Sequence, residues 1–211
     1  TFAPGETSKT ITPYVPWDSA DELDEFYTLE LFDPINAELS GGVPILRTLS
    51  GSAVMEGGSF AWINPRTCVI GCGIRVNREG AEQVGEVLKR QGVDLIIIDL
   101  VGYDIHIDGS FQMVDKDLAL VDPFGLPFSF LEKLKELKVR TIEITPADNK
   151  WIVNSLAVAP GELIMPEGAT NRTLDLMAKH GLRWSVLPYD KMQLNGGGIH
   201  CSTTPLIRDP V

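Results

Sequence analysis

The stretch Phe60-Ala-Trp-Ile-Asn-Pro-Arg-Thr-Cys-Val-Ile-Gly71 contains two apolar runs separated by a turn sequence, Asn64-Pro65-Arg66. This pattern predicts a β-hairpin. An amphipathic pattern from about 78 to 90 then predicts a helix that ends at Gly92, and a continuous apolar strand follows over 94–100. The apolar positions of the helix are Ala81, Val84, Val87 and Leu88. The segment therefore reads as strand–strand–helix–strand.

The same order recurs twice further along the chain. The second copy is predicted as strands 110–114 and 117–121, helix 128–138 and strand 141–145. The third copy is predicted as strands 152–158 and 162–165, helix 171–180 and strand 184–188. A unit that cannot bury its own sheet face must pack against copies of itself, so we expect an α/β propeller-like ring of ββαβ units. Three units are complete. Residues 198–208 resemble the opening of a further unit. Residues 1–50, with a strand-like run at 44–48, resemble the end of an earlier unit.

Composition limits the class of protein. A chain of 211 residues with 44% apolar content can bury a real core, and we expect one domain over 1–211. The net charge is -11 without a basic cluster, which disfavours nucleic acid and anionic membranes as partners. No apolar run reaches bilayer length and no signal peptide is recognisable. Three cysteines cannot all pair internally, which favours a reducing cytoplasm, and Cys68 and Cys72 are expected in the core.

The repeat also predicts where chemistry is located. Counting 22 residues back from the first two helix starts reaches Glu56 and His106, the third equivalent falls near Asn149, and Cys201 opens the fourth unit. Equivalent positions in a ring of repeats face a common axis, so we expect these side chains to converge. Asp108 should share a strand face with His106, because side chains two apart point the same way.

These residue types form a coherent chemical set. A cysteine attacks as a thiolate, a nearby histidine transfers protons, and a carboxylate orients the histidine. A second carboxylate, Asp108, suits a planar cation such as a guanidinium. The alternatives are a buried free cysteine at the start of a strand, an exposed turn acid at Glu56 and a satisfied surface histidine at His106. His200 is expected to point to the other strand face, away from the thiol.

Three motifs in this order and spacing resemble the guanidino-group-modifying (pentein) superfamily: Glu56-Gly-Gly58, His106-Ile-Asp-Gly-Ser-Phe111 and Gly196-Gly-Gly-Ile-His-Cys-Ser-Thr-Thr-Pro-Leu-Ile-Arg208. This superfamily includes arginine deiminases, agmatine deiminases, dimethylarginine hydrolases and arginine:glycine amidinotransferases. The resemblance covers about residues 44–208, and it implies a propeller-like fold of the repeated unit.

The resemblance implies a role for each candidate residue. Cys201 would be the nucleophile, His106 the general acid and base, and Asp108 the ligand of the guanidinium nitrogens. Glu56 would hold the substrate or His106. Arg75 would meet the substrate carboxylate, the alternative being a surface charge at the end of a hairpin. Gly198, in the glycine run before the thiol, would line the substrate site.

The implied activity is hydrolysis of the guanidinium of arginine or a close relative, giving citrulline, or ornithine in a dihydrolase, with ammonia. The alternatives are transfer of the amidino group to an amine and a non-catalytic member that binds a partner. No metal or organic cofactor is implied, the partner is a small guanidino substrate, and a homo-oligomer is compatible with the sequence. The superfamily carries a further aspartate, usually after an arginine, in a unit that would precede this chain. No Arg-Asp pair occurs in residues 1–50, so we expect the N-terminal unit to be missing.

Overall fold

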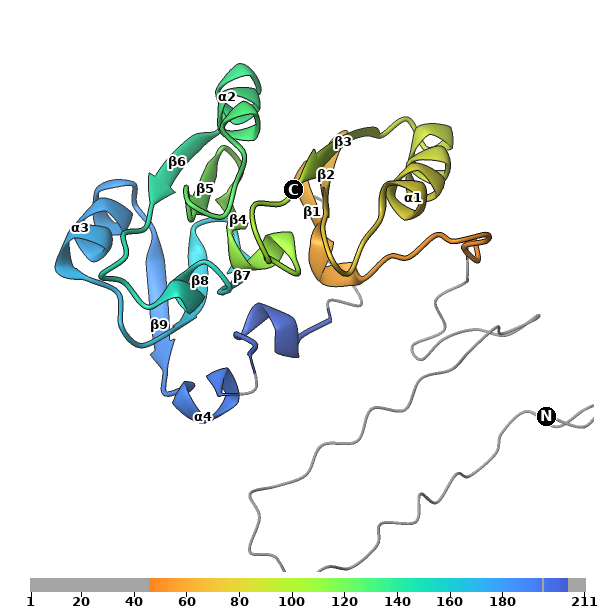
Figure 1. Cartoon of the computed structure of the whole chain (residues 1–211). Coiled ribbons are helices and arrows are strands. Elements are labelled where there is room, and N and C mark those ends of the chain that lie inside the picture. Colours follow the sequence, from red (N-terminus) through yellow and green to blue (C-terminus); the bar gives the residue numbers. More distant parts are fainter. Residues whose placement is uncertain (1–45, 195, 205–211) are drawn as a thin grey trace, which may run out of the picture. The chain divides into compact units, whose positions relative to one another are not determined.

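The computed structural model describes residues 46–194 and 196–204, and within them three sheets of three strands follow one another along the chain (Figure 1). In each sheet the first two strands pair antiparallel as a hairpin. The third strand runs parallel to the second after a helix. The structure therefore confirms the ββαβ unit and its three copies. Most of the two incomplete ends, including 1–45 and 205–211, lies outside the described residues.

The first unit comprises β1 (Phe60–Asn64), β2 (Thr67–Cys72), α1 (Arg78–Arg90) and β3 (Asp94–Asp99). The side chain of Asn77 caps α1 by accepting a hydrogen bond from the backbone N–H of Gly80 at 2.8 Å. Gly92, with φ +74°, allows the left-handed turn by which the chain leaves the helix. The cap and the glycine explain why the helix has the bounds expected from the sequence.

The other two units repeat this plan with shorter helices. The second unit comprises β4 (Phe111–Asp115), β5 (Leu118–Val121), α2 (Phe128–Glu136) and β6 (Arg140–Glu143). The third comprises β7 (Leu156–Ala159), β8 (Glu162–Pro166), α3 (Asn171–Lys179) and β9 (Arg183–Leu187), and a short helix α4 (Asp190–Gln193) follows it. Every hairpin shifts its register at the end of its first strand. The three hairpins thus share even their irregularity.

A short 3-10 turn precedes the first strand of each unit, and this corrects two expectations. The turns are η1 (Gly57–Ser59), η2 (Ile107–Gly109) and η3 (Lys150–Ile152), and a fourth, η4 (His200–Ser202), contains Cys201. The strand expected at 152–158 therefore begins only at residue 156, and Asp108 lies in a turn rather than on a strand face with His106. The cause is that in each turn a backbone N–H donates a hydrogen bond to the carbonyl three residues earlier. In η2, for example, the N–H of Ser110 donates to the carbonyl of Ile107 at 2.9 Å.

The two larger apolar clusters lie between successive units, and two smaller ones pack α1 against the sheet of the first unit. All four residues of β5 are buried. Its Ala119 and Val121 belong to an apolar cluster with residues of the first unit, including Val69 and Ile98. The alternate residues of β5, Leu118 and Leu120, belong to a second cluster with Leu163, Met165 and Met177 of the third unit. Because full burial of one such side chain is worth about 1.5–3 kcal/mol, packing between copies is the main stabilising term expected for the repeat.

A buried carboxylate fixes the start of α3. Asp148 is 8% exposed, and its Oδ1 accepts the backbone N–H of Thr170, the N-cap residue, at 2.6 Å. Its Oδ2 accepts the backbone N–H and the hydroxyl of Thr145, both at 2.8 Å, and the hydroxyl of Thr173 at 3.0 Å. The two backbone N–H groups can only donate, one to each carboxylate oxygen, so this position favours an ionised acceptor.

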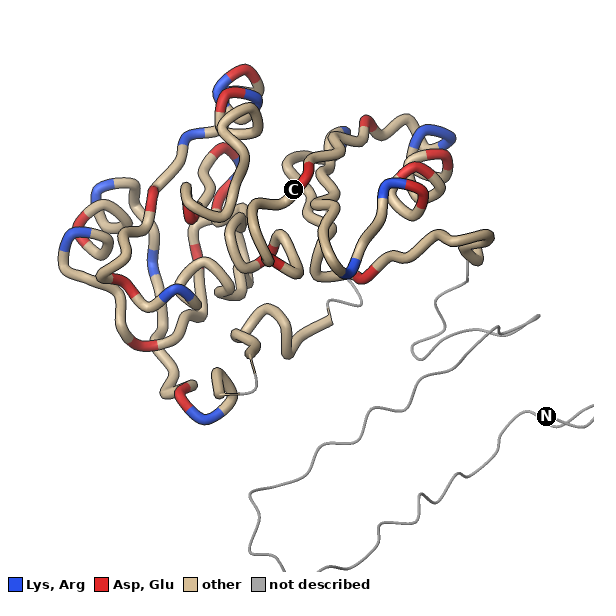
Figure 2. Tube along the Cα trace, in the orientation of Figure 1, with Lys and Arg blue, Asp and Glu red and all other residues tan. Residues whose placement is uncertain are grey.

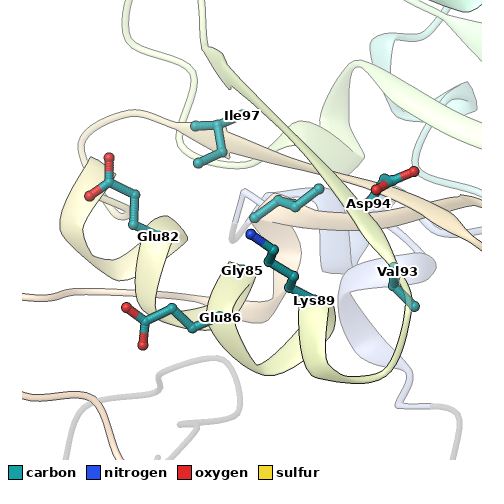
Figure 3. Close-up of a pocket in the computed structure, with 8 residues that line it drawn as sticks. Glu82, Gly85, Glu86, Lys89, Val93, Asp94 and Ile97 are labelled. Atoms are coloured by element: carbon teal, nitrogen blue, oxygen red, sulfur yellow. The ribbon is translucent and has the colours of Figure 1, made fainter.

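The surface charges are mixed in sign. Figure 2 shows acidic and basic residues interspersed on α1, α2 and α3, and the charged residues of the strands lie at strand ends. A groove of about 450 Å³ runs between α1 and β3 (Figure 3). Its lining comprises Glu82, Gly85, Glu86, Lys89, Val93, Asp94, Leu95 and Ile97. The groove contains none of the candidate site residues. No described helix is long and apolar enough to cross a bilayer.

Candidate active site

The positions that the repeat spacing singled out are structurally equivalent. Glu56, His106 and Asn149 are the N-cap residues of η1, η2 and η3. The turns η1 and η2 contact each other, whereas η3 contacts β8 of its own unit. Two of the three equivalent side chains therefore meet, and the third does not join them.

Glu56 and His106 form a close pair. The imidazole Nε2 lies 2.6 Å from Oε2 of Glu56, and both side chains are partly exposed. The other ring nitrogen lies over Gly58, because a Cβ at this residue would sit 2.6 Å from Nδ1 of His106. A glycine is required at this position so that the ring can lie against the backbone.

Arg75 lies at the edge of this pair. Its Nη1 is 3.5 Å from Oε1 of Glu56, and 57% of its side chain is exposed. An exposed ion pair of this kind contributes little to stability. The structure therefore places Arg75 next to Glu56 with more than half of its side chain exposed to solvent.

Cys201 lies against Asp108. The sulfur is 3.6 Å from Oδ2 of Asp108, which is only 3% exposed. Nδ1 of His200 lies 3.0 Å from the same oxygen. The expectation that His200 points away from the thiol is wrong, because residues 200–202 form a tight turn and not an extended strand. With three residues per turn, adjacent side chains are about 120° apart instead of opposite, and here both reach Asp108.

The surroundings of Cys201 favour the protonated thiol in the absence of a ligand. Partial burial of the sulfur raises the pKa of Cys201 even though the residue has an exposed surface. The negative charge of Asp108 raises it further, while hydrogen bonds from the Gly198 backbone and the Asn154 side chain lower it. A cation bound beside Asp108 would cancel the repulsion and favour the thiolate.

The two pairs share one turn. His106 is the N-cap of η2 and Asp108 is its second residue, so the acid–base pair and the thiol–carboxylate pair are separated by two positions of backbone. The Cα atoms of His106 and Asp108 are therefore at most about 7 Å apart. The candidates Glu56, His106, Asp108 and Cys201 thus lie in or next to three turns, and η2 contacts both of the others, η1 beside the Glu56–His106 pair and η4 through Cys201.

Asn154 is a site residue that the sequence reasoning missed. Its Nδ2 lies 3.1 Å from the Cys201 sulfur, and its Oδ1 accepts the backbone N–H of Cys201 at 3.1 Å. Asn149, the equivalent chosen by spacing, instead donates to the carbonyl of Glu167 and to the side chain of Gln193.

A signal for Asn154 is nevertheless present in the sequence. Gly58-Ser59 and Gly109-Ser110 directly precede β1 and β4, and Asn154-Ser155 directly precedes β7. Aligning the units on this serine places Asn154 where the other two have glycine, and it aligns Cys201-Ser202 with them.

Gly198 packs against Asn154. A Cβ at Gly198 would lie 2.4 Å from Oδ1 of Asn154, so only glycine lets the loop before Cys201 approach the amide. The structure thus gives Gly198 a packing role. Its expected contact with substrate stays a prediction. Within the described ranges, no three His, Cys, Asp or Glu residues are grouped so that they could hold a metal ion.

The sequence resembles a characterised enzyme over most of its length. No family model matches the chain. It is 24% identical over 206 residues to arginine deiminase of Listeria welshimeri, a match that covers 79% of this chain and 50% of the relative. The chain spans about half the length of the curated relative that it matches.

Solved structures share the arrangement of the three units. The N-terminal domain of ArgZ bound to product, an arginine dihydrolase from the ornithine–ammonia cycle in cyanobacteria, superposes with a TM-score of 0.65 at 17% identity, covering 74% of this chain and 58% of that one. The amidinotransferase SxtG from Microseira wollei gives 0.63 at 17% identity, covering 73% and 45%. DDAH from Pseudomonas aeruginosa, complexed with citrulline, gives 0.60 at 20% identity, covering 72% and 55%. The chain has the pentein fold. Penteins with this arrangement thus include a dihydrolase and an amidinotransferase, so the fold alone does not select one reaction.

Proposed function

We propose that this pentein hydrolyses the guanidinium group of arginine or a close relative through a covalent adduct on Cys201. The observation that carries the proposal is the 3.6 Å contact between the Cys201 sulfur and the buried carboxylate of Asp108. A guanidinium that hydrogen-bonds to Asp108 would place its carbon next to the sulfur, and its charge would favour the thiolate. The similarity to arginine deiminase supports this substrate class.

The proposed reaction has two halves. The Cys201 thiolate adds to the guanidinium carbon, and the tetrahedral adduct then breaks one C–N bond. His106, held by Glu56, gives its proton to the departing amine, which leaves as ammonia. A water then adds to the thiouronium carbon and gives a proton back to His106. The C–S bond breaks, the ureido product leaves, and the thiolate is restored.

Incubation of the chain with arginine alone tests this proposal. Release of ammonia together with citrulline, or with ornithine for a dihydrolase, is the expected result. His106→Ala should lower kcat by about 10²–10⁴-fold, the usual contribution of a positioned acid–base histidine. Glu56→Gln keeps the shape and removes the charge that faces the ring, so it should lower kcat with a smaller effect on KM. Absence of any product from arginine and related guanidino compounds would refute the hydrolase.

Amidino transfer is the second candidate, because the superposition on SxtG is as good as that on the ArgZ domain. It uses the same Cys201 adduct but delivers the amidino group to an amine. Ornithine that forms from arginine only when an amine such as glycine is added, without ammonia, would support the transferase. A non-catalytic binding role predicts that chloroacetamidine fails to label Cys201, or labels it at a rate unchanged by His106→Ala.

A further inference from the structure

One buried amide joins the turn that carries the thiol to the turn that carries the carboxylate. Asn154 is 0% exposed. Its Oδ1 accepts the backbone N–H of Cys201 at 3.1 Å. Its Nδ2 donates to the Cys201 sulfur at 3.1 Å and to the backbone carbonyl of Asp108 at 3.2 Å. Its backbone carbonyl also accepts the N–H of His200 at 3.0 Å. The whole side chain is therefore engaged by Cys201 and Asp108.

The partners fix which end of the amide faces the sulfur. A backbone N–H can only donate and a carbonyl can only accept, so Oδ1 must face Cys201 N and Nδ2 must face the Asp108 carbonyl. The group beside the sulfur is thus an N–H donor. It stabilises a thiolate more than a thiol, because a hydrogen bond to a charged acceptor is the stronger one.

Asn154 and Asp108 act on the sulfur in opposite directions. The Asp108 carboxylate can accept a hydrogen bond from the thiol and repels the thiolate, whereas the amide favours the thiolate. The charged and titratable groups that face the sulfur in the described part of the chain are Asp108 from η2 and His200, which contacts the same carboxylate from η4. When a cation occupies Asp108, the amide becomes the dominant neighbour.

The position of Asn154 in the repeat supports a specific role. The other two units carry Gly58 and Gly109 immediately before the corresponding buried serine. The backbone of this position therefore does not need an amide side chain. A buried amide costs stability unless it is hydrogen-bonded. The hydrogen bonds that satisfy the Asn154 side chain are made to the candidate nucleophile, Cys201, and to the backbone carbonyl of Asp108.

We propose that Asn154 is a positioning residue that holds the Cys201 sulfur beside Asp108 and donates the hydrogen bond that stabilises its thiolate. The assignment rests on the proposed role of Cys201 as the nucleophile. This proposal predicts that Asn154 controls the reactivity of the Cys201 thiol even when no substrate is present. It can therefore be tested independently of the activity assay.

The pH dependence of Cys201 alkylation by iodoacetamide in the full chain measures this effect, with the labelled peptide identified by mass spectrometry. Asn154→Ala should move the midpoint of the rate upward by about one pH unit, so that alkylation below the midpoint is about tenfold slower. Asn154→Asp, which keeps the shape and the acceptor for the Cys201 backbone, should move it further. Ser155→Ala is the matched control, because Ser155 is buried and adjacent but donates to the carbonyl of Ile152 at 2.6 Å.

Each outcome bears on the proposal. A shift in the Asn154 variants with wild-type behaviour in Ser155→Ala supports it, and if Asn154→Ala does not fold, the near-isosteric Asn154→Asp decides. Variants of Asn154 that alkylate like the wild type overturn it, as does an equal shift in Ser155→Ala, which would indicate general loosening. A shift in the Asn154 variants of a protein that turns over no guanidino compound would uphold the positioning of the thiol and refute the proposed function.

Discussion

Replacing Asp148 with asparagine should remove a pH-dependent part of the stability of the chain. The carboxylate receives hydrogen bonds from three threonines, Thr145, Thr170 and Thr173, and two of the donors are backbone N–H groups that cannot reverse their polarity. An asparagine presents an NH₂ group to one of these donors whichever way its amide turns. We therefore expect a loss of stability at neutral pH.

The size of the effect follows from the titration of this carboxyl. Burial raises the pKa of Asp148, but the hydrogen bonds from Thr170 and Thr145 together outweigh burial and lower the pKa from 3.8 to about 2. At about 1.4 kcal/mol per pH unit this corresponds to an unfolding free energy on the order of 2 kcal/mol. Because the pKa is depressed on folding, this contribution is present above the pKa of the unfolded chain. It is lost as the pH falls from about 4 toward about 2.

Urea unfolding of the wild type and Asp148→Asn across this range is the assay. The gap between their unfolding free energies should narrow by about 1–2 kcal/mol between about pH 6 and about pH 2.5, because only the wild type can titrate at this site. Asp175→Asn, which removes a charge from the exposed face of α3, should change stability by less than about 0.5 kcal/mol. A gap between the wild type and Asp148→Asn that stays constant with pH would refute the reasoning.

Two further predictions concern the site. Gly58→Ala should lower kcat by more than about tenfold while the chain stays folded, because the new Cβ would lie 2.6 Å from Nδ1 of His106 and displace the ring. Gly57→Ala is the control. Its Cβ would meet no atom within 4 Å, so this variant should have the kcat of the wild type. Iodoacetamide should modify Cys201 in the folded chain and leave Cys68 intact, because burial raises the pKa of Cys68 to about 11 and excludes the reagent. Mass spectrometry of the labelled peptides checks this, and modification of Cys68 at a rate similar to Cys201 without denaturant would contradict it.

The architecture was predictable because its signals are local and occur three times. The helix expected at 78–90 has those bounds in the structure, and the hairpins, helices and strands of the other units lie within a few residues of their expected positions. Hydrophobic period and turn residues determine these elements. The spacing of 22 residues before a helix also identified Glu56 and His106 as equivalent positions, and their side chains are paired.

The errors concern the short turns before the first strands. Extended geometry was expected for residues 106–108 and 200–202, but 3-10 turns cover Ile107–Gly109 and His200–Ser202, and one or two backbone hydrogen bonds hold each turn. Such turns have no hydrophobic period, so the direction of His200 could not be read from alternation. Asn154 was missed because the count was directed at the cap position, which it reached in all three units. Asn154 occupies a different position, immediately before the buried serine, where the other two units have glycine.

Each candidate reactive side chain lies within one of the 3-10 turns or at the N-cap of one. The apolar clusters, in contrast, consist mainly of residues from strands, helices and their connections. Damage to reactivity and damage to folding are therefore separable in this molecule. Substitutions of the partly exposed side chains Glu56, His106 and Cys201 should yield abundant, well-behaved protein that is nevertheless inert, whereas Ile107 and Ile152 of the turns belong to the apolar clusters. A screen that scores variants by expression level would pass such substitutions as harmless, and only a chemical readout of the thiol or of turnover would reveal them.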